Sequence, residues 1–283
     1  MIYNGIAQVL PSRGGMEVNM KITTLVENIP NCRLKATHGL ALYIETPKHN
    51  ILFDVGPNDD TLFKNCDVLG IDLSKVDIMI LSHGHFDHGG ALQKFLRINP
   101  TAKVYAQKKA FEKHYAKAFL RKTNIGVSPH FQNHPQVTLL DGDYVIDDEL
   151  TLFTVTDTQK YRSSANDMLY TQTGKDDFSH EHNLIISGDT NVLIMGCGHC
   201  GVINILEKAA VYNPKVCIGG YHLWNPKTKK TVSDDLLEDI AQELANYDIR
   251  FYTGHCTGGH AYSYFKKQLP HMYYLACGET IVV

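Results

Sequence analysis

The stretch that decides the fold is 76–90, which reads VDIMILSHGHFDHGG. Its first half is an apolar run typical of a buried strand. Directly after that run, His83, His85, Asp87 and His88 fall within six residues. Imidazole nitrogens and carboxylate oxygens suit a borderline divalent ion such as Zn²⁺. The glycines around them permit the sharp backbone turns that a compact ligand loop needs. We therefore expect a metal-binding loop at the end of a buried strand.

Short apolar runs and helical patterns alternate on both sides of this stretch. A hairpin is expected around Gly188 and Asp189, and the last two runs are expected to pair as strands. The expected strands are 21–26, 41–45, 51–55, 76–82, 104–106, several within 137–155, 184–187, 192–195, 215–218, 250–252, 272–275 and 280–283. The expected helices are 59–69, 91–98, 108–121, 202–211 and 233–246. Hairpins and strand–helix units in both halves predict an α/β protein with two mixed β-sheets packed together and helices outside.

The composition predicts one large domain. The chain has 283 residues, of which 43% are apolar and 20% charged, enough for a sizeable core. No low-complexity tract or Pro/Gly/Ser-rich linker divides it, so residues 21–283 are expected to form a single domain. Residues 1–20 are interpreted as an N-terminal extension or alternative start region, because Met16 and Met20 precede the first strand-like run.

Charge and cysteine usage narrow the class of protein. Lys and Arg number 27 against 30 Asp and Glu, and the net charge of -3 provides little attraction to nucleic acid or to an anionic membrane. No apolar run approaches the roughly 18 residues of a membrane span, and the first twenty residues lack the apolar core of a signal peptide. Seven scattered cysteines, an odd number, fit reduced thiols. A cytoplasmic protein without a membrane partner is predicted.

The run from His83 to His88 resembles the hallmark of the metallo-β-lactamase superfamily, His-x-His-x-Asp-His. The segment ILFDVG at 51–56 resembles that superfamily's strand with a supporting aspartate, here Asp54. The segments GCGHCG at 196–201 and GHCTG at 254–258 resemble motifs of one subgroup, the metal-dependent hydrolases related to dihydropterin ribofuranosyl-aminobenzene phosphate synthases. The resemblance extends from about residue 21 onward. It implies a four-layer αβ/βα sandwich with metal ions in a groove at the edge of the two sheets.

The resemblance also implies a ligand set and an activity. Two divalent ions, zinc foremost with iron or manganese as alternatives, would activate a hydroxide against an ester, lactone, thioester or phosphoester. Histidine rather than glutamate at the second hallmark position, His85, favours zinc-type hydrolysis over oxygen chemistry. Asp54 would fix a ligand histidine by a hydrogen bond. The implied ligands are His83, His85 and His199 for one ion, and Asp87, His88 and His255 for the other.

Several residues remain open at this point. A bridging ligand could come from Asp189, although Gly-Asp is also ordinary turn chemistry, or from Cys197 as a thiolate. His180 and His182 compete with His199 for the third position on the first ion. His222 follows another strand and is a candidate catalytic residue alongside Asp87, with a core histidine as the alternative. His260 is expected to cap or pack near a helix start.

Two other functions compete with hydrolysis of a small molecule. Cys197 and Cys200 form a CxxC sequence, as in thiol–disulfide redox proteins. Six basic residues between Lys108 and Lys122 could serve a phosphodiesterase or nuclease, although a solvated helix face is the default interpretation and nucleic acid the less favoured partner. The expected partner is a small molecule, phosphorylated molecules included. Tyr221, Trp224 and the loop 160–177 are candidates for the lining of its groove.

Overall fold

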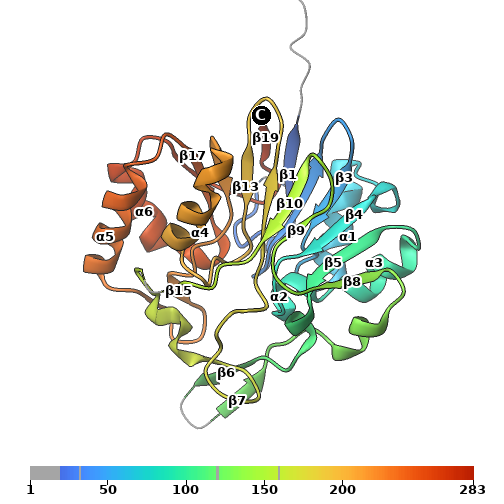
Figure 1. The fold of residues 1–283 in the computed structure, drawn as a ribbon, viewed down its shortest axis with the longest axis horizontal. Helices are drawn as coiled ribbons and strands as arrows, with labels where there is room; N and C mark the ends of the chain where they lie inside the picture. Colours follow the sequence, from blue (N-terminus) through green and yellow to red (C-terminus); the bar gives the residue numbers. More distant parts are fainter. Residues whose placement is uncertain (1–19, 32, 119–120, 159) are drawn as a thin grey trace, which may run out of the picture.

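Two seven-stranded sheets with the same plan form the centre of the molecule (Figure 1). The computed structural model describes residues 20–31, 33–118, 121–158 and 160–283. The first sheet has the order β19 (Thr280–Val282), β1 (Lys21–Val26), β2 (Ala41–Glu45), β3 (Asn50–Phe53), β4 (Ile78–Leu81), β5 (Lys103–Gln107), β8 (Val137–Leu140). The second has the order β18 (Met272–Tyr274), β17 (Arg250–Thr253), β14 (Val216–Ile218), β13 (Val192–Ile194), β12 (Asn183–Ile186), β10 (Leu150–Phe153), β9 (Tyr144–Val145). In each sheet, antiparallel strands form one side and parallel strands form the other.

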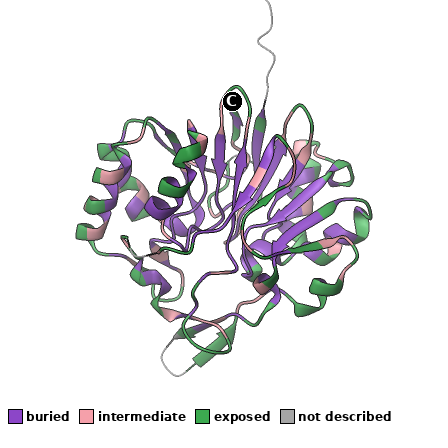
Figure 2. Ribbon diagram, viewed as in Figure 1, coloured by how far each residue is buried: buried purple, intermediate pink, exposed green. Residues whose placement is uncertain are grey.

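Helices cover the outer face of each sheet, which makes four layers (Figure 1). The first sheet carries α1 (Asp59–Leu69) and α3 (Leu92–Ile98), and the second carries α4 (Val202–Ala209), α5 (Asp234–Leu244) and α6 (Gly259–Gln268). Alternate residues of a strand face opposite layers: Ile51 and Phe53 pack between the sheets, whereas Leu52 packs toward the helices. The strands are therefore buried on both faces, while the outer helix faces are exposed (Figure 2). The predicted four-layer sandwich of two mixed sheets is confirmed.

Smaller elements complete the fold. A three-stranded sheet contains β11 (Leu169–Tyr170), β6 (Tyr115–Ala118) and β7 (Arg121–Asn124), and a hairpin contains β15 (Trp224–Asn225) and β16 (Lys230–Thr231). A single helical turn, α2 (Phe86–Gly89), follows the loop after β4. The short 3-10 helices are η1 (Leu73–Lys75), η2 (Lys108–Phe111), η3 (Pro129–Asn133), η4 (Ser164–Met168), η5 (Ala210–Tyr212) and η6 (His255–Thr257). No helix in the described part of the chain has the length and apolar character of a membrane span.

Helix α1 illustrates how local chemistry sets an element. Asn58 accepts a hydrogen bond from the Thr61 N–H at 2.9 Å, Asp59 and Asp60 lie in the first turn, and Gly70 ends the helix with φ at 70°. An N-cap of this kind contributes about 1 kcal/mol, and acidic residues are favourable at the positive end of the helix dipole. The predicted helix 59–69 and its stop are confirmed.

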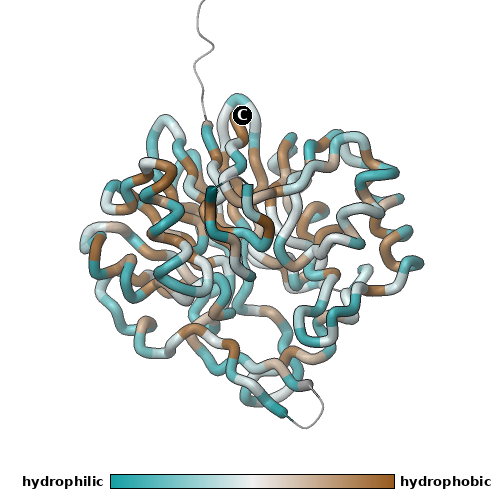
Figure 3. Tube along the Cα trace, turned by 180° about the vertical axis from the view of Figure 1, so that it is seen from behind, coloured by the Kyte–Doolittle hydropathy of each residue, from teal (hydrophilic) through white to brown (hydrophobic). Residues whose placement is uncertain are grey.

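The predicted helix over 108–121 is wrong. The chain there forms η2 and then β6, which pairs with β7 and with β11 from far along the sequence. A hydrogen bond to Asp176 holds His114 in the interior. Ala116 packs in the core between the second sheet and its helices. These long-range contacts stabilise the strand pairing of this segment, whereas its charge pattern alone is also compatible with a helix. Figure 3 shows the resulting hairpin at the bottom of the molecule as a hydrophilic extension.

The expectation that the last two strands pair with each other is also wrong. Strand β18 adds in parallel to β17 in the second sheet, whereas β19 adds antiparallel to β1 in the first. Each strand completes the edge of a different sheet, so the chain crosses between the sheets at its end. The hairpin around Gly188 and Asp189 is confirmed, since β12 and β13 pair antiparallel on either side of it. The single domain over 21–283 stays a prediction, and residues 1–19 of the expected extension lie outside the described residues.

Candidate metal centre

The predicted ligands meet where the parallel strands of both sheets end. Asp54 follows β3, residues 82–88 follow β4, residues 196–199 follow β13, residues 219–222 follow β14, and residues 254–256 follow β17. Carboxyl ends of neighbouring parallel strands share one edge of a sheet, and that edge is where α/β folds place their sites. Because the two sheets are stacked, the loops of one sheet face those of the other. Residues distant in sequence thus line one buried volume.

Three histidines, called here the first ligand group, are His83, His85 and His199. Their ligand nitrogens lie within 4.8 Å of one another, and all three side chains are buried. The Nε2 atoms of all three are buried with no hydrogen-bond partner among the described residues. Burying one such unpaired polar atom costs about 1–3 kcal/mol. Three lone pairs aimed into one volume are the donor set of a divalent ion, so the residues fit the metal that the resemblance implies.

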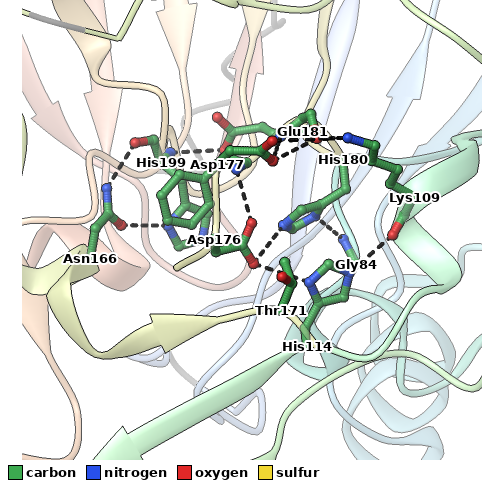
Figure 4. Close-up of polar contacts among 12 residues, drawn as sticks. Gly84, Lys109, His114, Asn166, Thr171, Asp176, Asp177, His180, Glu181 and His199 are labelled. Carbon is green, nitrogen blue, oxygen red and sulfur yellow. Dashed lines mark hydrogen bonds and ion pairs between the residues drawn. The ribbon is translucent and has the colours of Figure 1, made fainter. Parts of the chain in front are cut away.

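Hydrogen bonds orient two of these rings. His83 Nδ1 donates to Ser82 Oγ at 2.8 Å, and that hydroxyl donates to Asp54 at 2.7 Å. His199 Nδ1 donates to Asn166 Oδ1 at 2.9 Å, while the Asn166 amide donates back to the His199 carbonyl at 2.9 Å (Figure 4). With Nδ1 protonated, the free lone pair of each ring is on Nε2. The sequence analysis assigned no role to either residue: Asn166 lies in no recognisable motif, and Ser82 directly precedes the His83–His88 run but was not singled out.

The second ligand group is Asp87, His88 and His255. His88 Nε2 lies 3.2 Å from His255 Nε2, and Asp87 Oδ2 lies 3.4 Å from His255 Nε2. His88 Nδ1 donates to Asp54 at 2.6 Å, as expected of the supporting aspartate, and His255 Nδ1 donates to Asn28 Oδ1 at 3.1 Å. The two facing Nε2 atoms thus have their lone pairs toward each other, an arrangement that needs a cation or a proton between them.

Burial alone would lower the pKa of His88, but the attraction of Asp54 outweighs it and raises that pKa to about 9. His83, His85 and His199 show the opposite direction: burial and the neighbouring histidines hold their pKa values well below the usual range. The first ligand group is therefore neutral at pH 7, the state in which imidazole binds a metal. His88 must release a proton to do the same.

Cys197 lies between the two groups. Its Sγ is 3.1 Å from His88 Nε2, and it lies within 4.8 Å of ligand atoms of His83, His199 and His255. Burial raises the pKa of this thiol well above its ordinary value, so without a nearby cation it stays protonated. Asp189, the other candidate for the bridging position, lies in the β12–β13 turn beside Met20 and Pro47, away from both groups. The turn interpretation of Asp189 is therefore the correct one.

Two buried glutamate side chains accept hydrogen bonds from the backbone of the ligand loops in the second half. Glu181 accepts hydrogen bonds from the N–H groups of His199 and Cys200, at 2.8 and 2.9 Å. Glu27 accepts from the N–H of His255 at 2.5 Å. Burial raises the pKa of both glutamates despite these bonds. The sequence analysis missed both, since a lone glutamate carries no spacing signal.

Figure 4 shows a second hydrogen-bonded network. It lies behind His85, whose ring centre is 5.7 Å from that of His114 and 5.3 Å from that of His180. Asp176 accepts from His114 Nδ1 at 3.1 Å and from His180 Nε2 at 3.2 Å, and His180 Nδ1 accepts the Gly84 N–H at 2.9 Å. His114 Nε2 also lies within hydrogen-bond distance of the Lys109 carbonyl, at 3.0 Å, so both nitrogens of this ring have a partner. His180 is thus occupied in holding the ligand loop.

The two histidines that competed with His199 do not join the first ligand group. His180 belongs to the network just described, and His182 donates from Nε2 to the Leu81 carbonyl at 2.9 Å. His260 lies at the start of α6, as expected near a helix start, but it is exposed and bonds Asp234 at 2.9 Å. It does not cap that helix, whose N-cap residue is Gly258.

The CxxC pair does not form a joint thiol site. Cys200 is a free, buried thiol whose Sγ contacts the Val155 carbonyl at 3.6 Å, whereas Cys197 faces His88. Burial raises the pKa of the Cys200 thiol well above its ordinary range, the opposite of an activated redox cysteine. The helix after the motif begins only at Val202. This geometry gives the redox alternative no support.

A cavity of about 260 Å³ opens beside both ligand groups. His222 lines it; its buried Nδ1 has no partner among the described residues, and its ring lies 4.1 Å from that of His199. His38, which the sequence analysis missed, also lines it, with Nε2 3.4 Å from Asp87 Oδ2. The loop 160–177 contributes Ala165, Met168 and Leu169, as expected. Tyr221 does not: it is buried in the helix-covered core against Phe265, and Trp224 lies beside His38 without lining the cavity.

Comparison with known proteins confirms the predicted resemblance. Residues 34–159 match the model of the metallo-beta-lactamase superfamily. The solved structure of Tm1679, described as a metal-dependent hydrolase of the beta-lactamase superfamily, superposes with a TM-score of 0.78 at 24% identity. The match covers 93% of this chain and 99% of that one. The fold of the superfamily thus extends over both halves of the molecule.

Two relatives come from Methanocaldococcus jannaschii. One, the uncharacterized protein MJ0448, is 29% identical over 92% of this chain and 99% of its own length. The other is named 7,8-dihydropterin-6-methyl-4-(beta-D-ribofuranosyl)-aminobenzene-5'-phosphate synthase and is 26% identical over 88% of this chain and 92% of its own length. The subgroup that the motifs at 196–201 and 254–258 indicated is therefore represented among the relatives.

Proposed function

We propose that this protein is a metal-dependent hydrolase that binds two divalent ions, zinc first among them. His83, His85 and His199 would hold one ion, and Asp87, His88 and His255 the other, with Cys197 between them. The single observation that carries the proposal is the convergence of three buried Nε2 atoms without a partner in the described structure. A divalent cation that binds these three lone pairs would offset the cost of their desolvation.

The second ligand group supports the same proposal. His88 and His255 direct Nε2 atoms at each other across 3.2 Å, and the carboxylate of Asp87 adds a negative charge beside them. Cys197 supplies a sulfur within reach of both groups. Two nitrogens, a carboxylate and a thiol form a donor set that suits zinc, with iron and manganese as alternatives.

When bound, divalent ions would supply water activation and polarise a substrate oxygen. In the hydrolysis of an ester, lactone, thioester or phosphoester, the oxygen of water bonds to the acyl carbon or phosphorus, and the bond to the leaving group breaks. A proton passes to the leaving atom. Asp87 and His222 are the residues of this chain that we assign to holding that proton and contacting the substrate, since both line the cavity beside the ligands.

The experiment is a comparison of metal-loaded and chelator-treated protein on matched esters, lactones, thioesters and phosphoesters. We expect turnover of at least one class by the loaded protein, loss of it on chelation, and recovery on adding zinc. His222→Asn is expected to lower kcat, because His222 lines the cavity beside both ligand groups. Turnover that survives chelation would contradict the proposal.

A second candidate is a synthase reaction on the same site. It is favoured by one observation, the 26% identical relative whose name gives an aminobenzene phosphate product. Product analysis by mass spectrometry distinguishes the two candidates, with an aromatic amine supplied as a competing acceptor. Incorporation of the amine would favour the synthase, whereas incorporation of labelled water oxygen alone would favour the hydrolase.

A further inference from the structure

The cavity beside the ligands has two chemically different walls. His85, Asp87 and His199 form one, and the other is apolar, with side chains such as Phe86, Ile125, Met168, Leu169 and Pro226. Phe86 keeps 46% of its surface exposed although it is large and apolar. An exposed aromatic next to a polar reaction centre is typical of a surface that a ligand covers. This wall of the cavity would therefore fit an apolar segment of a ligand.

A second, outer pocket of about 340 Å³ continues this cavity. The two share Ala165, Met168 and Asn225 in their walls. The outer pocket differs in character, because its wall carries two ammonium groups, Lys117 from β6 and Lys230 from β16. Hydroxyl donors of Ser164, Thr228 and Thr231 surround them. The inner cavity is thus mainly apolar, with one ammonium group at Lys227, whereas the outer pocket carries two.

The positive charge of the outer pocket is not neutralised within the protein. Neither Lys117 nor Lys230 forms an ion pair with the described residues, whereas lysines such as Lys160, Lys208 and Lys215 each pair with a carboxylate. The pocket does contain one acid, Asp167, but that carboxylate pairs with Arg162 at 2.7 Å and with Lys175 at 3.6 Å. Lys117 and Lys230 thus have no carboxylate partner among the described residues, and an anionic group of a ligand would supply one.

We propose that the substrate carries an oxyanion, phosphate or carboxylate, which Lys117 and Lys230 bind in the outer pocket while an apolar segment fills the inner cavity. The inference rests on the proposed function for the reacting bond and adds the chemical class of the remote end. Two lysines from different small sheets converge on this pocket, so the β6–β7 and β15–β16 hairpins would act together as the specificity element of the groove.

The test uses three phenyl esters of one linear acyl chain that ends in a methyl, a carboxylate or a phosphonate group. The quantity measured is the ratio of kcat/KM for each anionic ester to that for the methyl ester, with the metal-loaded protein. We expect a ratio of about ten or more for at least one anion, the size of one charge-assisted hydrogen bond. The double variant Lys117→Met/Lys230→Met is expected to reduce that ratio to about one, because the charge is lost and the chain length kept.

The matched control is Lys113→Met/Lys229→Met, which removes two nearby charges that do not line either pocket. The control is expected to keep the ratio of the natural protein. A ratio near one in the natural protein, or a ratio that persists in the Lys117/Lys230 variant, would overturn the proposal. Which anion gives the higher ratio separates a phosphate from a carboxylate.

A parallel binding measurement separates failure of this inference from failure of the proposed function. Phenyl ketones with the same three chain ends have no bond to hydrolyse, and calorimetry gives their affinities directly. If no ester is hydrolysed but the anionic ketones bind about tenfold more weakly to the Lys117/Lys230 variant, the anion pocket stands and the hydrolase proposal fails. Equal affinity of the anionic ketones for the natural protein and for the Lys117/Lys230 variant would overturn the proposal of an anion pocket, whatever the esters show.

Discussion

The two halves of the molecule contribute to the candidate metal centre in different ways. The first half supplies His83, His85, Asp87 and His88 from six consecutive residues after β4. The second half supplies His199 and His255 from loops after two separate strands, β13 and β17. A contiguous ligand loop owes its geometry to local backbone structure, whereas separate loops owe theirs to the order of strands in a sheet. The first kind can be read from the spacing of its residues. The second was indicated here only by the resemblance of segments 196–201 and 254–258 to known motifs, and its geometry requires the fold.

The largest expected effect compares one ligand from each half. His85→Gln and His199→Gln each remove a ligand from the same group, so each should slow hydrolysis more than about a hundredfold, beyond the tenfold to hundredfold typical of outer partners. The double variant should be little worse than either single variant, because residues that act as one unit are not additive. Steady-state kinetics of the three variants tests this, with His260→Gln as the exposed control. Full activity in His199→Gln would return the third position to His180.

The next effect concerns Asp54, the shared anchor of the first half. It accepts hydrogen bonds from Ser82 and His88 and thereby orients a ligand of each group. We expect Asp54→Asn to weaken metal binding about tenfold to hundredfold, as loss of an outer carboxylate usually does. Competition with a coloured chelator measures the change. The surface variant Asp60→Asn is the control, and equal affinity in the two variants would show that the anchor is dispensable.

A smaller effect tests the contact between the halves. A Cβ on Gly196 would overlap the hydroxyl of Ser82 and crowd His83, whereas a Cβ on Gly188 meets nothing nearer than 3.9 Å. Gly196→Ala should therefore lower the free energy of unfolding by about 1–3 kcal/mol, the usual cost of overpacking. Denaturant titration of both alanine variants measures it. Equal stability would mean that the two loops separate readily.

The smallest effect is a pH dependence in the network behind His85. Burial alone would raise the pKa of Asp176, but His180 and His114 hold it well below the ordinary value. The stabilisation is therefore fully present above about pH 4, where an unfolded aspartate is ionised, and is lost as pH falls further. The difference in unfolding free energy between the natural protein and Asp176→Asn should shrink as pH falls from 7 to 3. The exposed Asp239→Asn provides the control; a difference that stays constant with pH would contradict the assignment.

Much of the fold was predictable because its strands are buried on both faces and stand out as short apolar runs. The ligand loop after β4 was predictable for the same reason, since it follows one of those runs at a fixed spacing. The helix expected over 108–121 failed because β6 is held by partners more than fifty residues away, at Leu169 and Tyr170. No local pattern reports such pairing.

The residues that support the ligands from outside could not be predicted from the sequence, for a related reason. Glu27, Glu181 and Asn166 contact ligand residues through the backbone or a single amide, and His38 precedes a strand without a motif of its own. Their role depends on the stacking of two sheets rather than on spacing along the chain. Asp189 shows the converse, because it looked like a ligand locally and lies far from the centre in space.

The two-metal centre is tested by the metal content per chain of the purified protein and of the variants His88→Ala and His255→Ala. These residues lie in different halves but face each other across 3.2 Å. We expect about two ions per natural chain and a loss of about one in each variant, as for a two-metal site. An unchanged metal content in both variants, or natural protein that binds no metal at all, would contradict it.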